Sequence, residues 1–165
     1  MRSAFVSILA IAAAAGMSAQ QPAPVPNPHA DMNQRGAEVM GFDQEKTAHH
    51  FYLYADGGAI DVSVKDAADR TDLDAIRSHL PHIAMMFAQG NFDAPMLVHA
   101  TANVPGTADM ARLKARLAFK YVETSMGGRV DIVTTDASAL RAVHAFLTFQ
   151  ISDHATGDST AVRKR

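Results

Sequence analysis

Two histidines and a methionine lie close together in the stretch IRSHLPHIAMMF, residues 76–87, and their types suit a soft metal ion. If the stretch is a helix, the three-residue step from His79 to His82 places both imidazoles on one face, and Met86 follows on the same stripe. Imidazole and thioether ligands favour copper, and imidazole also suits zinc. Pro81 interrupts one helical hydrogen bond, so the stretch is also typical of a kinked core helix.

The remaining histidines widen the set of candidate metal ligands. The chain has 8 histidines, 9 methionines and no cysteine. His99 would add a third imidazole if it turned toward the first helix, and His50 lies on a polar strand face. His49 points to the opposite face from His50 because strand side chains alternate. The predicted ligands of a copper or zinc ion are therefore His79, His82, Met86, His99 and His50.

Residues typical of catalysis are sparse. The chain has no Gly-x-Ser-x-Gly elbow, no His-Glu-x-x-His helix and no phosphate loop, and the absence of cysteine excludes a thiol nucleophile. Asp61 and Asp131 could form a carboxylate pair only if two hairpins brought them together. We therefore assign no catalytic residue from the sequence, which favours a binding protein over an enzyme and leaves a small enzyme as an alternative.

The N-terminal residues predict export. Arg2 precedes the apolar stretch 4–16, which is too short to span a bilayer, and a small-x-small cleavage site ends at Ala19. We interpret residues 1–19 as a signal peptide cut after Ala19, and predict a periplasmic or secreted protein without a membrane span in its mature form. Alternating prolines in residues 20–38 indicate an extended linker. A single domain is expected over 39–156, followed by a polar and basic tail over 157–165.

Two hairpins account for most of the expected strands. Residues 49–54 and 59–64 flank the sequence ADGG, and residues 117–124 and 129–134 flank MGG. Alternating apolar residues around glycine pairs predict tight hairpins with the glycines in the turn at positive φ.

An amphipathic helix is expected after each hairpin, one starting at Thr71 and the other capped by Asp136. Between the two units, residues 95–100 predict a buried strand, and Thr107 predicts the cap of a short helix.

The two hairpins also resemble each other. GGAIDVSV at 57–64 matches GGRVDIVT at 127–134 nearly position for position, which indicates duplicated β-β-α units. Because each hairpin and each helix has one apolar face, the economical architecture is an α+β two-layer sandwich. Its sheet would be mainly antiparallel with helices on one face, and a strand and a short helix would join the two units.

The charge balance restricts the partners. The chain has a formal net charge of −2 over 165 residues, which argues against the clustered basic face that nucleic-acid binding needs. The open face of the predicted sheet is polar enough for water, and could also serve as a binding or homodimer face.

Five stretches carry a resemblance to a known set of proteins: MGFDQEKTAHHFYL, DGGAIDVSV, IRSHLPHIAMMF, GGRVDIVT and HAFLTFQISDH. The likeness extends over about residues 39–158, and this region resembles small exported bacterial proteins of unassigned function. Members of the set sometimes carry the label aspartate carbamoyltransferase. Such a transferase has about twice this length and a Ser-Thr-Arg-Thr phosphate loop, and no such string occurs in this chain. The resemblance implies export and a shared fold, and transfers no catalytic residue.

Three hypotheses of function follow from the sequence. The first is an exported binding or accessory protein that holds copper or zinc through histidine and methionine. The second is a metal-free module that binds a ligand or a partner on the open sheet face. The third is a small hydrolase or isomerase.

Overall fold

A four-stranded antiparallel sheet forms one layer of the molecule. The computed structural model describes residues 28–165. The strands are β1 (Thr47–Tyr54), β2 (Gly57–Val64), β3 (Ala118–Thr124) and β4 (Gly127–Val133), and their order in the sheet is β1-β2-β4-β3. Each hairpin therefore contributes one edge strand and one central strand. The two hairpins themselves were expected from the alternating sequence patterns.

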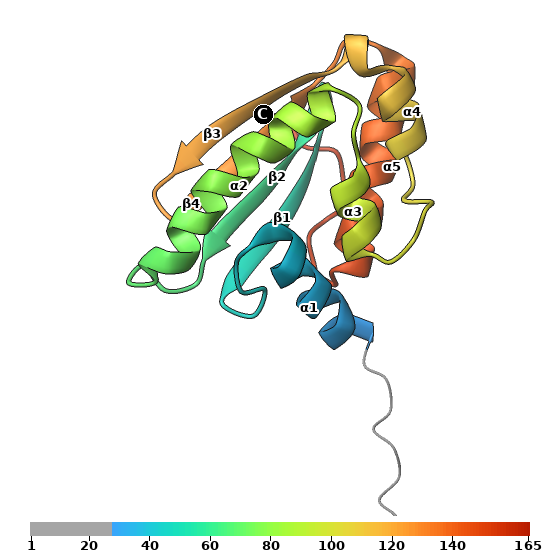
Figure 1. The fold of residues 1–165 in the computed structure, drawn as a ribbon. Coiled ribbons are helices and arrows are strands. Elements are labelled where there is room, and N and C mark those ends of the chain that lie inside the picture. The colour runs from blue at the N-terminus through green and yellow to red at the C-terminus, as the bar shows by residue number, and fades with distance from the viewer. Residues whose placement is uncertain (1–27) are drawn as a thin grey trace, which may run out of the picture.

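Helices cover one face of this sheet. The two long helices are α2 (Arg70–Ala88) and α5 (Ala137–Asp153). Helix α2 lies over β3 and β4, whereas α5 lies over β1 and β2 (Figure 1). Each long helix thus covers the hairpin of the other unit. The α+β two-layer sandwich expected from the sequence is confirmed.

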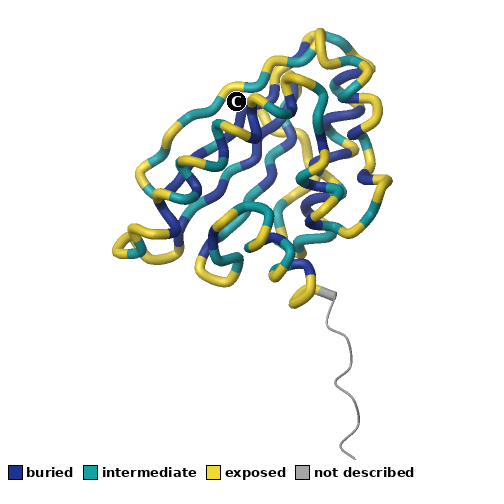
Figure 2. Tube along the Cα trace, in the orientation of Figure 1, coloured by how far each residue is buried: buried dark blue, intermediate teal, exposed yellow. Residues whose placement is uncertain are grey.

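The hydrophobic core lies between these layers, and buried residues follow the central strands and the inward sides of the helices (Figure 2). Val130 and Ile132 of β4 and Phe146 and Leu147 of α5 are almost completely buried. His144 of α5 ties the helix to the first hairpin, because its Nε2 donates to the carbonyls of Tyr54 and Gly57 at 2.9 and 3.1 Å.

Aspartates begin both long helices. The Asp136 carboxylate accepts from the backbone N–H of Ser138 and Ala139, as predicted for the cap of α5. The cap of α2 is Asp69, whose side chain accepts from Asp72 N, so the helix begins before the predicted Thr71. Helix α2 continues through Pro81 to Ala88.

The pairing of the central strands is compatible with the repeat seen in the sequence. Asp61 pairs with Arg129 and Ala59 pairs with Asp131, around a central pair of Ile60 and Val130. A shift of 70 positions between β2 and β4 exchanges the pair Asp61–Arg129 with the pair Ala59–Asp131 and leaves the central pair unchanged. A local twofold axis through the central pair would give this pattern. Duplication of the two units stays a prediction.

The glycine pairs lie at the starts of β2 and β4, and the tight turns are formed by the residues before them. The prediction of glycine-containing turns was therefore wrong in position, and of the four glycines only Gly57 has a positive φ, +145°. Their main requirement is close packing. A Cβ on Gly127 would lie 2.0 Å from the Val62 carbonyl oxygen, and one on Gly58 would lie 2.1 Å from Leu147 Cδ1.

Two helices form the segment that joins the units, α3 (Asp93–Val98) and α4 (Thr107–Arg112), followed by a short 3-10 turn, Lys114–Arg116. The prediction of a strand at residues 95–100 was therefore wrong. Short apolar runs fit a buried helix as well as a strand. Pro95 lies in the first turn of α3, where a missing N–H costs nothing and the fixed φ favours a helix.

The folded region begins earlier and ends later than expected. Helix α1 (Pro28–Met40) occupies most of the range predicted as linker after residue 27, and packs against α3. Pro28 is the last of the alternating prolines, so nothing opposes a helix beyond it.

The tail predicted over 157–165 also makes contacts with the folded body. The Arg163 N–H donates to the carbonyl of Leu53 at 2.8 Å. The predicted signal peptide lies outside the described residues. Within residues 28–165, no helix has the length and apolarity needed to cross a membrane.

Candidate functional site: a histidine-lined pocket

Four histidines from four different parts of the chain line one pocket between the sheet and the helices. They are His49 of β1, His79 of α2, His99 at the end of α3 and His154 at the end of α5. The pocket has a volume of about 70 Å³. Its apolar walls are Met40, Phe51, Ile60, Val62, Leu80, Ile83, Phe87, Ala94, Pro95, Val98 and Phe146, and Gln150 adds one amide.

Local structure explains how each imidazole reaches the pocket. His49 points toward the helices because it alternates with His50 along β1. His79 lies next to the buried stripe of α2, beside Leu80. His99 and His154 are the C-cap residues of α3 and α5, and their backbone N–H groups continue the hydrogen bonding of those helices.

Aromatic contacts hold the rings in place. The His49 and His154 rings are stacked, with centroids 5.5 Å apart and an interplanar angle of 15°. The ring of His154 also meets His99 edge-on at 5.0 Å. Phe42 lies against His49 and His79, at 5.9 Å from each. These contacts make the imidazoles part of a packed wall.

Three of the four imidazoles are neutral at neutral pH. Burial lowers the pKa of His49 to about 3, and the neighbouring His154 contributes to this lowering. Burial likewise lowers the pKa of His79 to about 4, with a contribution from His82. The pKa of His154 is about 4 because burial and His99 outweigh the opposite effect of Asp153. Removal of water penalises the charged form of an imidazole.

Within residues 28–165, two ring nitrogens of this wall have no hydrogen-bond partner. Nε2 of His49 and Nε2 of His79 are buried and unpaired. A buried polar atom without a partner costs on the order of 1–3 kcal/mol. A neutral imidazole can either donate or accept at Nε2, depending on which nitrogen carries the proton. The pocket can therefore bind a ligand that supplies a donor or an acceptor at these two points.

His99 has a different environment from the other three. Its Nδ1 donates to the carboxylate of Asp153, and its Nε2 lies 3.0 Å from the amide oxygen of Gln150. The His99 side chain is only 1% exposed. Both of its nitrogens are engaged within the protein, so His99 contributes shape and orientation to the pocket.

The structure brings together only two of the five predicted metal ligands. His79 and His99 line the pocket, but His82 is exposed on α2 and Met86 lies outside the lining. His50 lies on the opposite face of the sheet, with Nδ1 3.0 Å from Asp158. Over residues 28–165, no group of three or more histidine or acidic side chains is arranged to hold a metal ion.

Sequence reasoning did not select His49, His154 or Gln150 as site residues. The alternation of β1 already placed His49 toward the core, which was a usable signal. His154 and Gln150 carry no such signal, because their proximity to His49 depends on how α5 crosses β1. The candidate pair Asp61 and Asp131 lies on the open face of the sheet, away from this pocket.

Comparison with known protein-family models, with curated protein sequences and with solved structures finds no match to this chain. The resemblance to small exported bacterial proteins therefore stays a prediction.

Proposed function

We propose that this protein is an exported binding protein that holds a small, neutral and mainly apolar molecule in the histidine-lined pocket. The observation that carries the proposal is a cavity with apolar walls that is lined by His49 and His79, two histidines whose Nε2 atoms are buried and have no hydrogen-bond partner among residues 28–165. A ligand that hydrogen-bonds to them removes an existing penalty, so it gains more from the same contact than it would on a hydrated surface.

The charge state of the pocket supports a neutral ligand. His49, His79 and His154 have pKa values of about 3, 4 and 4, and therefore carry no charge at neutral pH. An anion entering the pocket would lose its hydration without meeting a cation from these residues. A molecule with an apolar body and one hydroxyl, carbonyl or amide group matches the walls and the free nitrogens.

The volume supports a compact ligand, or the compact end of a larger one. A cavity of roughly 150 Å³ holds one benzene molecule. The volume of this pocket, about 70 Å³, is near half of that. It accommodates a group of a few non-hydrogen atoms without rearrangement of the core. Residues 1–19 have the pattern of a signal peptide, so the protein would meet its ligand outside the cytoplasm.

Ethanol is a suitable probe, because it has a short apolar chain and one hydroxyl group and is smaller than benzene. Ligand efficiency limits a molecule of three non-hydrogen atoms to about −4.5 kcal/mol, so binding no tighter than about millimolar is expected and NMR titration is the appropriate method. Saturable shifts of the Nε2 resonances of His49 and His79 are expected. Xenon, which cannot form a hydrogen bond, should perturb only the apolar wall around Ile83 and Leu80.

Matched variants identify the site. His49→Phe and His79→Leu should each weaken ethanol binding by about tenfold, the value of one hydrogen bond of about 1.4 kcal/mol. His50→Phe and His82→Leu are the controls, because they alter neighbouring histidines that do not line the pocket. Equal binding by all four variants, or no saturable shift in the native protein, would overturn the proposal.

A further inference from the structure

The C-terminal residues of the chain, 155–165, form an arm that runs beside β1. Asp158 accepts hydrogen bonds from His50 Nδ1 and from the backbone N–H of Phe51, both at 3.0 Å. Farther along, Arg163 forms a parallel bridge with Tyr54, and its guanidinium group lies 5.1 Å from the centre of the Tyr52 ring. The arm therefore follows the free edge of β1 and turns onto the open face of the sheet.

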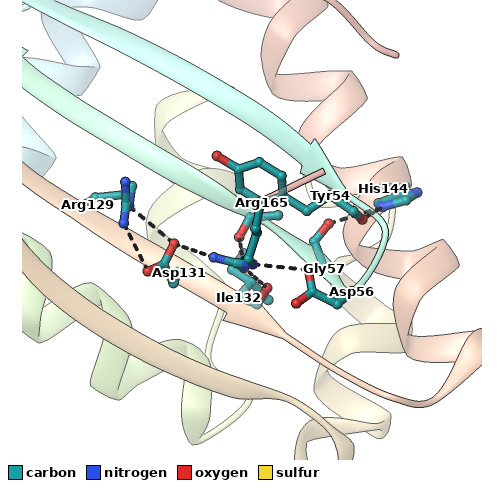
Figure 3. Close-up of polar contacts among 9 residues, drawn as sticks. Tyr54, Asp56, Gly57, Arg129, Asp131, Ile132, His144 and Arg165 are labelled. Carbon is teal, nitrogen blue, oxygen red and sulfur yellow. Dashed lines mark hydrogen bonds and ion pairs between the residues drawn. The ribbon is translucent and has the colours of Figure 1, made fainter. Parts of the chain in front are cut away.

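The arm ends with Arg165 in a cradle that surrounds its guanidinium group (Figure 3). Nε lies 3.0 Å from Asp56 Oδ1, and Nη1 lies 2.9 Å from Asp131 Oδ1. Nη2 reaches the carbonyls of Gly58 and Ile132 at 3.4 and 3.2 Å. The ring of Tyr54 lies 4.5 Å from the guanidinium carbon. We define the guanidinium cradle as Tyr54, Asp56, Gly58, Asp131 and Ile132.

The cradle is built from the sheet and does not depend on the arm for its shape. Gly58 and Ile132 are paired residues of the two central strands, and Asp131 is only 8% exposed. A Cβ on the neighbouring Gly57 would lie 1.9 Å from the Ile132 carbonyl oxygen, so the absence of a side chain keeps this acceptor accessible. The acceptors therefore stay in place whether or not Arg165 occupies them.

The charges of the cradle favour a cation. Arg129 lies 3.2 Å from Asp131 and offsets one of the two carboxylates, which leaves one net negative charge for the occupant. The four acceptors and the aromatic ring match the planar, forked shape of a guanidinium group. An ammonium group is compact and cannot contact all four acceptors at once.

The arm holds Arg165 only loosely. Every residue from Ser159 to Arg165 is exposed, and the Arg165 side chain is 33% exposed. Ion pairs with this degree of exposure contribute little to stability. A second guanidinium group can therefore compete with Arg165 for the same acceptors.

We propose that the guanidinium cradle is a receptor site for an arginine side chain of a partner polypeptide, and that Arg165 fills the site when the partner is absent. The occupant seen in the structure, the number of acceptors and the net charge all identify the ligand class. The arm acts as a competitor within the same chain, with an effective concentration on the order of millimolar for a short flexible connection. This inference does not depend on the ligand of the histidine-lined pocket.

The test uses the full-length chain with Arg165→Ala, which empties the cradle and alters only an exposed side chain of the arm. N-acetyl-L-arginine N-methylamide is titrated while the backbone amides of Gly58 and Asp131 and the ring of Tyr54 are followed by NMR. The lysine analogue of the same compound is the matched control. We expect saturable shifts at these three residues and at least about tenfold tighter binding of the arginine compound than of the lysine compound.

Three further measurements test the proposed arginine site. The native chain should bind the arginine compound at least about tenfold more weakly than the variant, because Arg165 competes. Asp131→Asn in the Arg165→Ala background should abolish the preference for arginine. Arg165→Lys should leave the cradle open to the compound, since a lysine cannot form the fork. Equal affinity for both compounds, or equal binding by the native chain and Arg165→Ala, would show that the cradle only anchors the arm.

Discussion

The three buried neutral histidines should make the stability of this protein fall steeply as the pH is lowered from about 7 to about 5. Their pKa values in the folded protein are about 3 for His49 and about 4 for His79 and His154, below the ordinary value of 6.5. The unfolded chain therefore binds more protons than the folded protein throughout this range. Stability then decreases as the pH falls below 6.5, and the decrease continues until the folded imidazoles protonate near pH 4 and below.

The size of the effect follows from the width of this window. A pH of 5 is about 1.5 units below the pKa of an imidazole in the unfolded chain. This difference corresponds to a loss of about 2 kcal/mol of unfolding free energy per histidine. Three histidines together give a loss on the order of 6 kcal/mol, comparable with the whole stability of an ordinary domain, about 5–15 kcal/mol. The protein should therefore unfold in mild acid, above the range in which aspartates titrate.

Carboxylates with shifted pKa values cannot produce a loss of stability between pH 7 and pH 5. Burial raises the pKa of Asp61, so protonation of this group would offset part of the loss and could not cause it. The pKa values of Asp43, Asp136 and Asp158 are lowered from 3.8, so their contributions are fully present above that value and are lost only below it. For Asp136 the main cause is its hydrogen bonds from the backbone at the start of α5. Any loss of stability between pH 7 and pH 5 therefore reports on histidine.

The assay is urea unfolding followed by far-UV circular dichroism at several pH values. His49→Phe should reduce the dependence of the unfolding free energy on pH by about one third, because one of three buried imidazoles is gone. His82→Gln, which alters an exposed histidine on the same helix as His79, should leave most of the dependence intact. An unfolding free energy that stays constant from pH 7 to pH 5 would refute the view that these imidazoles are buried and neutral.

Three other predictions concern the fold and the N-terminus. Gly127→Ala should lower the midpoint of urea unfolding far more than Gly36→Ala, because the new Cβ at Gly127 would lie 2.0 Å from a strand carbonyl oxygen, whereas the new Cβ at Gly36 would meet only the flexible side chain of Gln44 at 3.0 Å. Equal midpoints would contradict the close packing of β2 and β4. Phe146→Ala should reduce the unfolding free energy by about 3–5 kcal/mol in the same assay, since its ring is 2% exposed in the core. Mass spectrometry of the exported protein should show a chain that begins after Ala19, and a retained N-terminus would exclude the signal peptide.

The sequence predicted the sheet well because period-two alternation is a direct consequence of strand geometry. Ile60, Val62 and Val64 lie on the helix-covered face and Asp61 and Ser63 on the other, as their spacing indicated. The same reasoning failed for α3, where a short apolar run fits either structure. It also failed for residues 28–38, where a nearby proline-rich stretch obscured a helix.

The histidine pocket could be predicted only in part, because its residues converge from distant parts of the chain. Sequence spacing drew attention to His79 and His82, three residues apart on one helix. A step of three residues turns a helix by about 300°, so the two imidazoles straddle the edge of the buried stripe, and only His79 enters the pocket. His49 and His154 are far apart in the sequence, and their stacking depends on the packing of α5 across β1.

A crystal structure of the protein isolated from the compartment to which it is exported would test the binding proposal most directly. We predict electron density for a molecule other than water in the pocket, with one of its polar atoms within hydrogen-bonding distance of His49 Nε2 or His79 Nε2. An empty or water-filled pocket, with both nitrogens turned to partners within the protein, would contradict it.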